Sequence, residues 1–488
     1  MKKLLLLIWM GIMTLHICRA ENNNKSFSLP HIISSNMILQ QEQEVPIWGT
    51  ASPGERIKLI FDKKKISVRA NSHGDWKVML PAMKADKQPH TLTISAKDTT
   101  VVCTNVMIGE VWLCSGQSNM EYRMKLLPNF APPAKGIDLA AEELKKPEND
   151  MIRVFISDRR QSWDGWKVAG PESLPNVSAA GYFFAKKIQE ELDVPVGIIT
   201  AALGGTRIET WTPKEVYESS PVFAPILEKG KGRMQGVIPG ECYSQLLKPT
   251  IPYGIKGFLW YQGENNCAIE DQMYAEEFKL MTERWRKDFS LPKAPFYYVV
   301  IGPCVYSDRM HRNSTAPTTA ESLPLFCQQQ IDARELVPNC EYITITDLVD
   351  NLHDGHSSYK WEVGARLANV ALAKTYGKDS IVWSGPRIKE WERQNDEIVI
   401  TFDHCADGLK TNDKREFPRW FEIGTNDGFF RPALAKIISN NQIKVYHPDV
   451  KNPKHVRFGW HETALPNLVN SIGLPAVQFS TLEMERKR

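Results

Sequence analysis

Between residues 106 and 377, short apolar runs alternate with longer segments of helical periodicity. The apolar runs lie at 111–114, 152–156, 196–201, 255–260, 296–301 and 342–346. The amphipathic segments lie at 179–192, 273–289 and 361–375. A strand followed by a helix is the repeating unit of a parallel sheet that is covered on both faces. The alternation therefore predicts a doubly wound α/β/α domain over residues 106–377.

The pattern changes on both sides of this region. Short, partly alternating strands separated by turn residues occur from 27 to 105, and their spacing predicts an N-terminal antiparallel β-sandwich. A β pattern returns after residue 377 and predicts a second β-rich unit over 378–488. Three units agree with a length of 488 residues, which is too long for one compact core.

The amino terminus has the layout of a secretory signal peptide. Lys2 and Lys3 precede the apolar run 4–15, and polar residues follow Ala20. We therefore expect a signal peptide over residues 1–20 and an exported protein, secreted or periplasmic. No later stretch approaches the ~20 apolar residues needed to cross a bilayer, so we expect no integral membrane segment.

Charge and cysteine content narrow the expected partners. The 60 basic and 57 acidic residues give a net charge of +3 with no basic run, which argues against a nucleic-acid partner. The cysteines form no Cys-x-x-Cys pair, and there is no His-rich cluster, so we expect no structural metal. The oligomeric state stays open.

The first apolar run of the central region, 111–114, ends abruptly in the polar stretch 115–119. Open parallel sheets bind their ligands at the carboxyl ends of the strands. Gly116 allows the tight turn that would present Ser118 to solvent at this edge. Ser118 is thus the candidate nucleophile, and an ordinary polar loop is the alternative interpretation.

A nucleophilic serine requires a base, a carboxylate that orients the base, and donors for an oxyanion. Three loops that follow predicted strands could supply them. The first, 203–211, contains Gly204 and Gly205, whose N–H groups can closely approach a ligand. Arg207 and Trp211 of the same loop are candidates for the wall of a substrate pocket.

The other two loops carry amides and titratable groups. In the second, 260–266, Gln262 and Asn265 offer side-chain amide donors. The third, 347–356, holds two histidines and three carboxylates, more than a solvated loop usually carries. A serine followed much later by aspartate and histidine is a workable order for a triad, because triads are defined by geometry.

These motifs resemble those of the sialate O-acetylesterases, which belong to the Ser/Gly/Asn/His hydrolase superfamily. The similar blocks are Leu-Cys-Ser-Gly-Gln-Ser-Asn-Met-Glu at 113–121, Gly-Gly-Thr-Arg-Ile-Glu-Thr-Trp at 204–211, Trp-Tyr-Gln-Gly-Glu-Asn at 260–265, and the histidine-containing loop before 362–367. The flanking segments 35–40, 45–49 and 456–460 also resemble that family. The resemblance covers nearly the whole mature chain.

The resemblance implies an α/β/α esterase in which Ser118 attacks an acetyl carbonyl. Spacing to the 362–364 segment implies His356 as the base and Asp354 as its orienting acid. Superfamily members often have the acid three residues before the histidine, which fits Asp350 with His353, so this pair is the alternative.

The oxyanion donors implied by the resemblance are the backbone N–H groups of Ser118 and Gly205 (or Gly204) and the side chain of Gln262. Asn265 is the alternative third donor. The chemistry implied, acyl transfer through an acetyl-enzyme, requires no metal or organic cofactor.

The function implied is removal of O-acetyl groups from sialic acid. The alternatives are an acetylesterase of xylan or another polysaccharide and, from a different class, a non-catalytic carbohydrate-binding protein. Arg207, Trp211 and Glu264 are the expected contacts to the acetylated sugar. Arg207 and Arg123 are the candidates to bind a sialate carboxylate.

Overall fold

The structure is a computed structural model, which describes residues 26–126, 130–160, 162–308, 319–413, 415–425 and 428–486. The signal peptide expected at residues 1–20 lies outside the described residues, and it stays a prediction. None of the helices within these ranges has the length and apolar character needed to cross a membrane.

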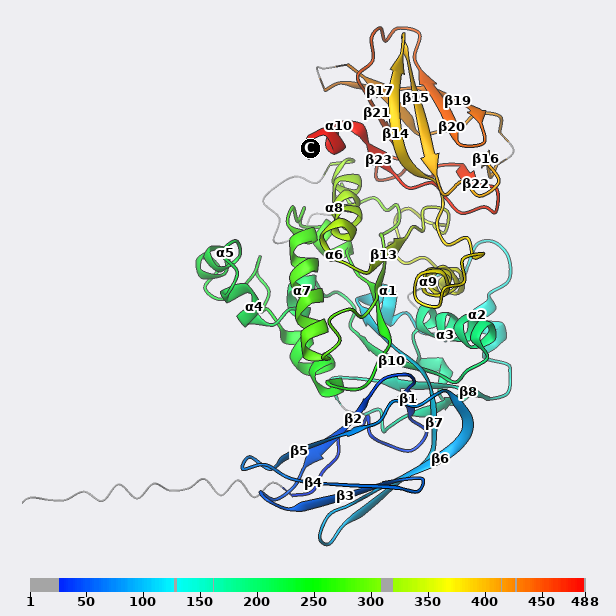
Figure 1. Cartoon of the computed structure of the whole chain (residues 1–488). Coiled ribbons are helices and arrows are strands. Elements are labelled where there is room, and N and C mark those ends of the chain that lie inside the picture. Colours follow the sequence, from blue (N-terminus) through cyan, green and yellow to red (C-terminus); the bar gives the residue numbers. More distant parts are fainter. Residues whose placement is uncertain are drawn as a thin grey trace, which may run out of the picture.

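A mostly parallel sheet lies at the centre of the chain, with the strand order β13-β12-β11-β7-β10-β8-β9 (Figure 1). Its strands are β7 (Thr100–Gly116), β8 (Asn149–Ile156), β9 (Lys167–Ala169), β10 (Val196–Ala202), β11 (Gly257–Tyr261), β12 (Phe296–Val299) and β13 (Cys340–Ile343). Neighbouring strands are parallel except β9, which runs antiparallel to β8. The predicted α/β class is confirmed as a mixed α/β fold with a central, mostly parallel sheet and further β-sheets.

Both faces of this sheet are buried, as the continuous apolar run in β7 indicates. Val111 and Leu113 belong to one core cluster, whereas Trp112 and Cys114 belong to the other. The first cluster includes residues of α7 (Tyr274–Asp288) and α8 (Ser322–Leu336), and the second those of α3 (Ala179–Leu192) and α9 (Lys360–Lys374). Figure 1 shows these two helix pairs on opposite sides of the sheet.

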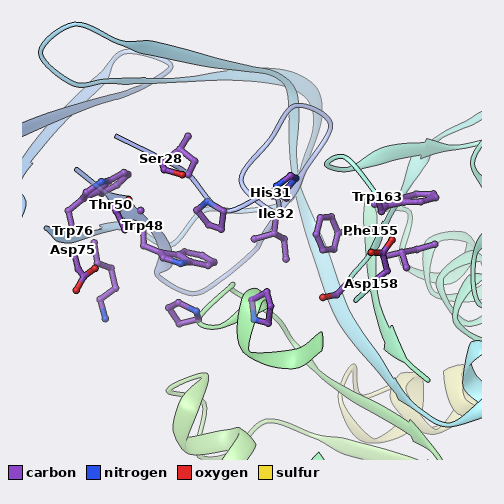
Figure 2. A pocket seen from close by; sticks show the side chains of 18 of the residues that line it. Ser28, His31, Ile32, Trp48, Thr50, Asp75, Trp76, Phe155, Asp158 and Trp163 are labelled. Carbon is purple, nitrogen blue, oxygen red and sulfur yellow. The ribbon is translucent and has the colours of Figure 1, made fainter. Parts of the chain in front are cut away.

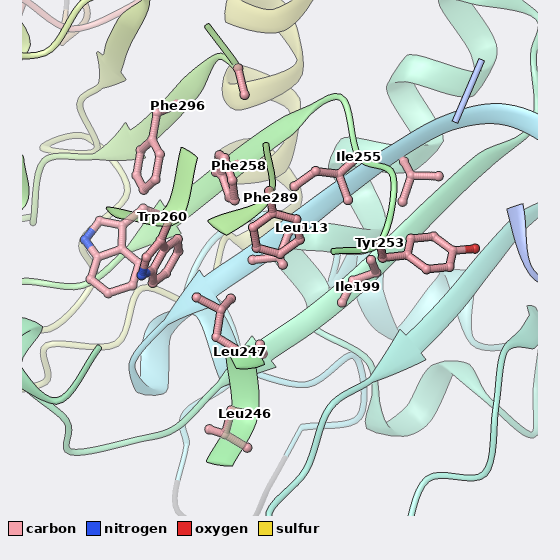
Figure 3. Packing of buried hydrophobic residues seen from close by; sticks show 14 of the residues in the cluster. Leu113, Ile199, Leu246, Leu247, Tyr253, Ile255, Phe258, Trp260, Phe289 and Phe296 are labelled. Carbon is pink, nitrogen blue, oxygen red and sulfur yellow. The ribbon is translucent and has the colours of Figure 1, made fainter. Parts of the chain in front are cut away.

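Aromatic side chains fill much of the first cluster (Figure 3). The ring of Phe258 on β11 lies 5.4 Å from that of Phe289 and 5.3 Å from that of Phe296. Burying each such side chain stabilises the fold by about 1.5–3 kcal/mol. The dense packing holds the strand ends, and with them the loops that follow, in fixed positions.

The N-terminal strands join the central sheet through β7. The strands β1 (Ile38–Gln40), β3 (Arg56–Phe61), β4 (Lys64–Arg69) and β6 (Asp86–Ser95) belong to the same 11-stranded sheet, and β2 (Val45–Thr50) pairs with β5 (Asp75–Leu80) in a separate ladder. The first half of β7 pairs with β6 and β1, and the second half pairs with β10 and β11. The boundary predicted at residue 105 thus falls inside one continuous strand.

The C-terminal residues form further antiparallel sheets around their own core cluster. The strands are β14 (Arg387–Gln394), β15 (Glu397–Asp403), β16 (Leu409–Thr411), β17 (Phe421–Gly424), β18 (Phe430–Pro432), β19 (Leu434–Ser439), β20 (Gln442–Tyr446), β21 (His455–Phe458), β22 (Leu468–Asn470) and β23 (Phe479–Ser480). The remaining α-helices are short: α1 (Ser118–Glu121), α2 (Leu139–Glu143), α4 (Lys214–Glu218), α5 (Ala224–Lys229), α6 (Glu264–Cys267) and α10 (Thr481–Arg486).

Candidate active site

Ser118 lies two residues after the end of the central strand β7, at the first residue of α1. The backbone of Gly116 has φ +142°, and a Cβ there would lie 2.1 Å from the carbonyl oxygen of Tyr261. The N–H of Gln117 donates a hydrogen bond to the same carbonyl over 3.1 Å. Only glycine fits this close approach of the two strand ends, and the resulting turn places Ser118 at the carboxyl edge of the sheet.

The structure brings Ser118, His356 and Asp354 together. His356 Nε2 lies 2.8 Å from Ser118 Oγ, and His356 Nδ1 lies 2.8 Å from Asp354 Oδ1. The backbone N–H of His356 also donates to Asp354 Oδ1 over 3.0 Å. The carboxylate therefore holds the histidine at two points and turns Nε2 toward the serine.

The environment of Asp354 keeps its carboxyl ionised. Partial burial acts to raise the pKa of Asp354, but the hydrogen bonds from the ring and backbone of His356 outweigh it, so the pKa is lowered from its ordinary value. An anionic carboxylate beside Nδ1 favours the imidazole tautomer whose Nε2 can accept a proton.

The alternative pair, Asp350 and His353, lies elsewhere in the same loop. Asp350 accepts hydrogen bonds from the N–H of Ala134 over 2.7 Å and from the hydroxyl of Tyr359 over 3.0 Å. His353 is exposed. The carboxylate of Asp350 thus anchors a neighbouring segment, and the pair that contacts Ser118 is His356 with Asp354.

A cavity of about 340 Å³ opens in front of Ser118. The residues that line it are Gln117, Ser118, Phe130, Gly205, Glu264, Asn265, Tyr306, Asp354, Gly355 and His356. The ring of Phe130 packs edge-on against His356 at 4.8 Å. Sequence reasoning missed Phe130 and Tyr306, because both lie in irregular segments without a motif.

Ser118 and Gly205, whose backbone N–H groups are expected oxyanion donors, both line this cavity. The N–H of Gly204 donates to Glu121 Oε2 over 2.7 Å, whereas Gly205 lines the cavity. A Cβ on Gly204 would lie 3.3 Å from Ser118 Cβ, so this loop packs directly against the serine. Of the two glycines, Gly205 is the one placed to face a ligand beside Ser118.

Gln262 differs from the expectation that it supplies the third oxyanion donor. Its side chain is fully buried, and its Nε2 lies 3.1 Å from Gln117 Oε1 and 2.7 Å from Asn266 Oδ1. The described residues that line the cavity do not include it, whereas they include Asn265, the alternative. Asn265 Nδ2 lies 3.9 Å from the position that a Cβ on Gly205 would take.

Arg207 also differs from its expected place in the pocket wall. Its side chain is buried, and Nη2 donates to the carbonyl oxygens of Gln235 over 2.7 Å and Met234 over 3.2 Å. Arg123, the other candidate for a sialate carboxylate, lies 3.9 Å from Glu121. Within the described chain, neither arginine lines the cavity.

Trp211 is part of the core and does not form a pocket wall. Its indole N–H donates to Thr206 Oγ1 over 3.0 Å, and its ring packs against Trp260 at 5.9 Å. Burial of this large side chain in the core stabilises the fold. Of the three expected substrate contacts, Glu264 alone lines the cavity, and its carboxylate accepts a hydrogen bond from Asn119 Nδ2.

A buried lysine behind the cavity was not expected from the sequence. Lys360 Nζ donates to Asn119 Oδ1 and to the carbonyl of Ser357, both over 2.6 Å. Burial lowers the pKa of Lys360 to about 7, although the carboxylates of Glu264 and Asp354 oppose this shift. Burial also raises the pKa of Glu264.

A serine in line with a histidine and a carboxylate, beside backbone N–H donors, is the arrangement that defines serine hydrolases. Comparison with known proteins indicates an esterase. The family described as "Carbohydrate esterase, sialic acid-specific acetylesterase" matches residues 108–373, more than half of the 488-residue chain. The chain belongs to this family, and the protein is a carbohydrate esterase.

Curated relatives and a solved structure extend the similarity beyond the matched region. The sialate O-acetylesterase of Mus musculus is 23% identical over 452 residues, which cover 80% of this chain and 82% of the relative. The sialate O-acetylesterase of Homo sapiens is 27% identical over 404 residues, which cover 74% of this chain and 73% of the relative. A carbohydrate acetylesterase from Xanthomonas citri superimposes with a TM-score of 0.78 at 29% identity, covering 93% of this chain and 99% of that one.

Proposed function

We propose that this protein is a serine esterase that removes O-acetyl groups from sugars, with O-acetylated sialic acid as its leading substrate. The observation that carries the proposal is the hydrogen-bonded line from Ser118 Oγ through His356 to Asp354, with 2.8 Å at each contact of the imidazole ring. The family description and the names of the curated relatives support sialate as the substrate.

In the proposed first half-reaction, Ser118 Oγ attacks the acetyl carbonyl carbon while His356 Nε2 accepts the hydroxyl proton. The N–H groups of Ser118 and Gly205 and the side-chain amide of Asn265 stabilise the oxyanion of the tetrahedral intermediate. His356 then donates its proton to the departing sugar oxygen, which leaves an acetyl group on Ser118.

In the second half-reaction, water attacks the acetyl-enzyme. His356 accepts a proton from the water, and the intermediate collapses with return of a proton to Ser118 Oγ and release of acetate. Asp354 stays ionised throughout and stabilises the imidazolium that forms in each half-reaction. Apart from the substrate and the attacking water, the scheme uses side chains and backbone groups of this chain.

One observation favours a second candidate substrate, a neutral acetylated polysaccharide such as xylan. Among the described residues that line the cavity at Ser118 there is no lysine or arginine, whereas Glu264 and Asp354 supply carboxylates. A sialate carboxylate gains most from a nearby cation, so this lining suits a neutral sugar better.

The proposal also covers where the protein is located and how its sheets and helices are layered. The signal-like layout of residues 1–20 supports an exported enzyme. The two buried faces of the central sheet support the α/β/α description, and the antiparallel N-terminal and C-terminal sheets support flanking β-sandwich-like units.

The test is acetate release from 9-O-acetylated sialic acid and, in parallel, from acetylated xylan, with wild type and Ser118→Ala. The proposal requires that wild type release acetate and that Ser118→Ala, folded as judged by circular dichroism, release none above background. If the wild type prefers xylan, the proposed substrate changes from sialic acid to xylan, and the proposed acyl-transfer mechanism still stands. Absence of release from both esters would contradict the proposed function.

A further inference from the structure

A second cavity, of about 690 Å³, lies between the N-terminal strands and the central sheet (Figure 2). None of the described residues lines both this cavity and the one at Ser118. Its volume lies in the range of about 300–1,000 Å³ typical of small-molecule sites, which often occur where two structural units meet. The reaction proposed above uses no residue of this cavity.

One wall of the cavity is a face of the β2–β5 ladder. Trp48 pairs directly with Lys77, and Thr50 pairs directly with Asp75. Because directly paired residues, and residues two apart on one strand, project to the same face, these four side chains share one surface. All four line the cavity. The wall thus combines a half-buried indole with hydrogen-bonding groups.

The opposite wall follows the end of β8 and carries Phe155, Asp158 and Trp163. Asp158 accepts hydrogen bonds from the N–H of Ser162 over 3.0 Å and from its hydroxyl over 2.6 Å, which fixes Ser162, the neighbour of Trp163. Lys167 Nζ lies 4.2 Å from the centre of the Trp163 ring and also holds it. This aromatic wall is therefore preorganised.

One indole N–H group at the cavity lacks a partner. Trp163 lines the cavity, and its Nε1 is buried without a hydrogen bond to any described residue. Trp76 alternates with Asp75 and Lys77 along β5, so its ring lies on the opposite face of the ladder, where it stacks on Phe27. Buried indole N–H groups are normally paired, so the unpaired group of Trp163 requires an explanation. A ligand with a hydroxyl oxygen would supply an acceptor for it.

The charges around the cavity are nearly balanced. The cavity is lined by the carboxylates of Asp75 and Asp158 and by the ammonium of Lys77, so positive charge is not in excess there. This balance disfavours phosphates and other strong anions, which require an excess of positive charge. The indole rings of Trp48 and Trp163, with mixed donors and acceptors around them, suit a neutral ring that has apolar faces and hydroxyl edges.

We propose that this cavity binds the neutral pyranose units of a glycan chain, at a site separate from Ser118. The sugar rings lie on the faces of Trp48 and Trp163, and their hydroxyls pair with the polar groups of the two walls. The site would hold a polysaccharide near the enzyme whether or not the bound units carry an ester. It therefore goes beyond the proposed esterase activity.

The experiment measures binding without turnover, on the full chain carrying Ser118→Ala. Xylohexaose, cellohexaose and mannohexaose, all without acetyl groups, are titrated by calorimetry. We expect at least one to bind, and we expect Trp48→Ala and Trp163→Ala each to weaken that binding roughly tenfold or more, as for removal of a central aromatic contact. Trp391→Ala on β14, outside the cavity, is the matched control and should leave the affinity unchanged.

With Ser118 intact, the Trp48 and Trp163 variants should hydrolyse 4-nitrophenyl acetate at the wild-type rate. If Trp48→Ala does not fold, Trp163→Phe, which keeps a ring and removes the indole N–H, carries the test and should also weaken binding. Absence of binding by all three oligosaccharides, or equal affinity in the cavity variants and the parent, would overturn the proposal. If the esterase assignment itself is wrong, the protein with Ser118 intact will not hydrolyse the ester, whatever the result of the binding experiment.

Discussion

The ammonium of Lys360 donates a hydrogen bond to Asn119 Oδ1 over 2.6 Å. This contact joins the first residue of α9 to the residue that follows Ser118. Asn119 Nδ2 in turn donates to the carbonyl of Gly355 over 2.8 Å, next to His356. A buried ammonium and amide thus hold the histidine loop and the serine turn in register, although the two lie more than two hundred residues apart in the chain.

Lys360 should make stability depend on pH in a defined window. In the folded protein burial lowers its pKa to about 7, whereas its ordinary value is 10.5. Between these values the unfolded chain holds a proton that the folded chain has lost, so stability rises with pH. We expect Lys360→Met to show a smaller rise of the thermal midpoint than wild type across this window. Lys84→Met, at an exposed lysine, is the control and should follow wild type. Parallel curves for wild type and Lys360→Met would contradict this assignment.

His356 and His353 should differ sharply when replaced. His356→Ala removes the base that contacts Ser118 Oγ, and kcat for acetate release should fall by about 10⁴-fold or more. His353→Ala changes an exposed side chain and should keep most of the activity. Steady-state acetate release from both purified variants checks this. Comparable loss in His353→Ala would favour the alternative pair.

Substitutions of Asn265 and Gln262 should have different effects, the first on catalysis and the second on stability. Asn265→Ala should lower kcat about 10²- to 10³-fold with little change in KM, the effect of removing one oxyanion donor. Gln262→Met should mainly lower the melting temperature, because Gln117 Oε1 and Asn266 Oδ1 lose a buried donor. Paired kinetics and thermal unfolding separate the two. A lower kcat without a lower melting temperature in Gln262→Met would assign the third oxyanion donor to Gln262.

Gly116 should tolerate no side chain. A Cβ at this position meets the carbonyl oxygen of Tyr261 at 2.1 Å, so Gly116→Ala must displace β11 or the serine turn. We expect a loss of more than about 4 kcal/mol in the free energy of unfolding, or failure to fold. Gly54→Ala is the matched control, because Gly54 also has positive φ, at +75°, but no atom lies within 4 Å of its Cβ position. Its cost should be about 1–2 kcal/mol. Denaturant titration compares the two, and equal losses would show that contact with Tyr261 is unimportant.

Local sequence patterns predicted the strands and helices of the central region well. Where each element begins and ends depended on the residues and strands that it contacts. The helix expected at 179–192 has these limits in α3, because Ser178 Oγ accepts the N–H of Gly181 at its start and Asp193 adopts a left-handed conformation at its end. The strand expected at 111–114 is much longer, since β7 extends from Thr100 to Gly116. Its first half is a strand because it pairs with β6 and β1, partners that no local pattern reveals.

For the site, sequence reasoning named the loops but not the direction of every side chain. Gln262 and Asn265 are three residues apart and chemically alike, yet one lies buried under the loop and the other lines the cavity. Arg207 and Trp211 have the chemistry of substrate contacts, but their neighbours bury them. Which way a polar side chain of a loop points depends on partners distant in the chain, which a single sequence does not place.

The sequence by itself determined the α/β class, the strand that leads to Ser118 and the loops that carry its candidate partners. These features follow from hydrophobic periodicity and from small and polar residues at strand ends, which are local properties of the chain. Only the tertiary structure decided that His356 and Asp354 meet Ser118, that Asn265 lines the cavity, and that Lys360 ties the loops together. These contacts join residues far apart in sequence, and packing of the whole sheet is what brings them within a few ångströms.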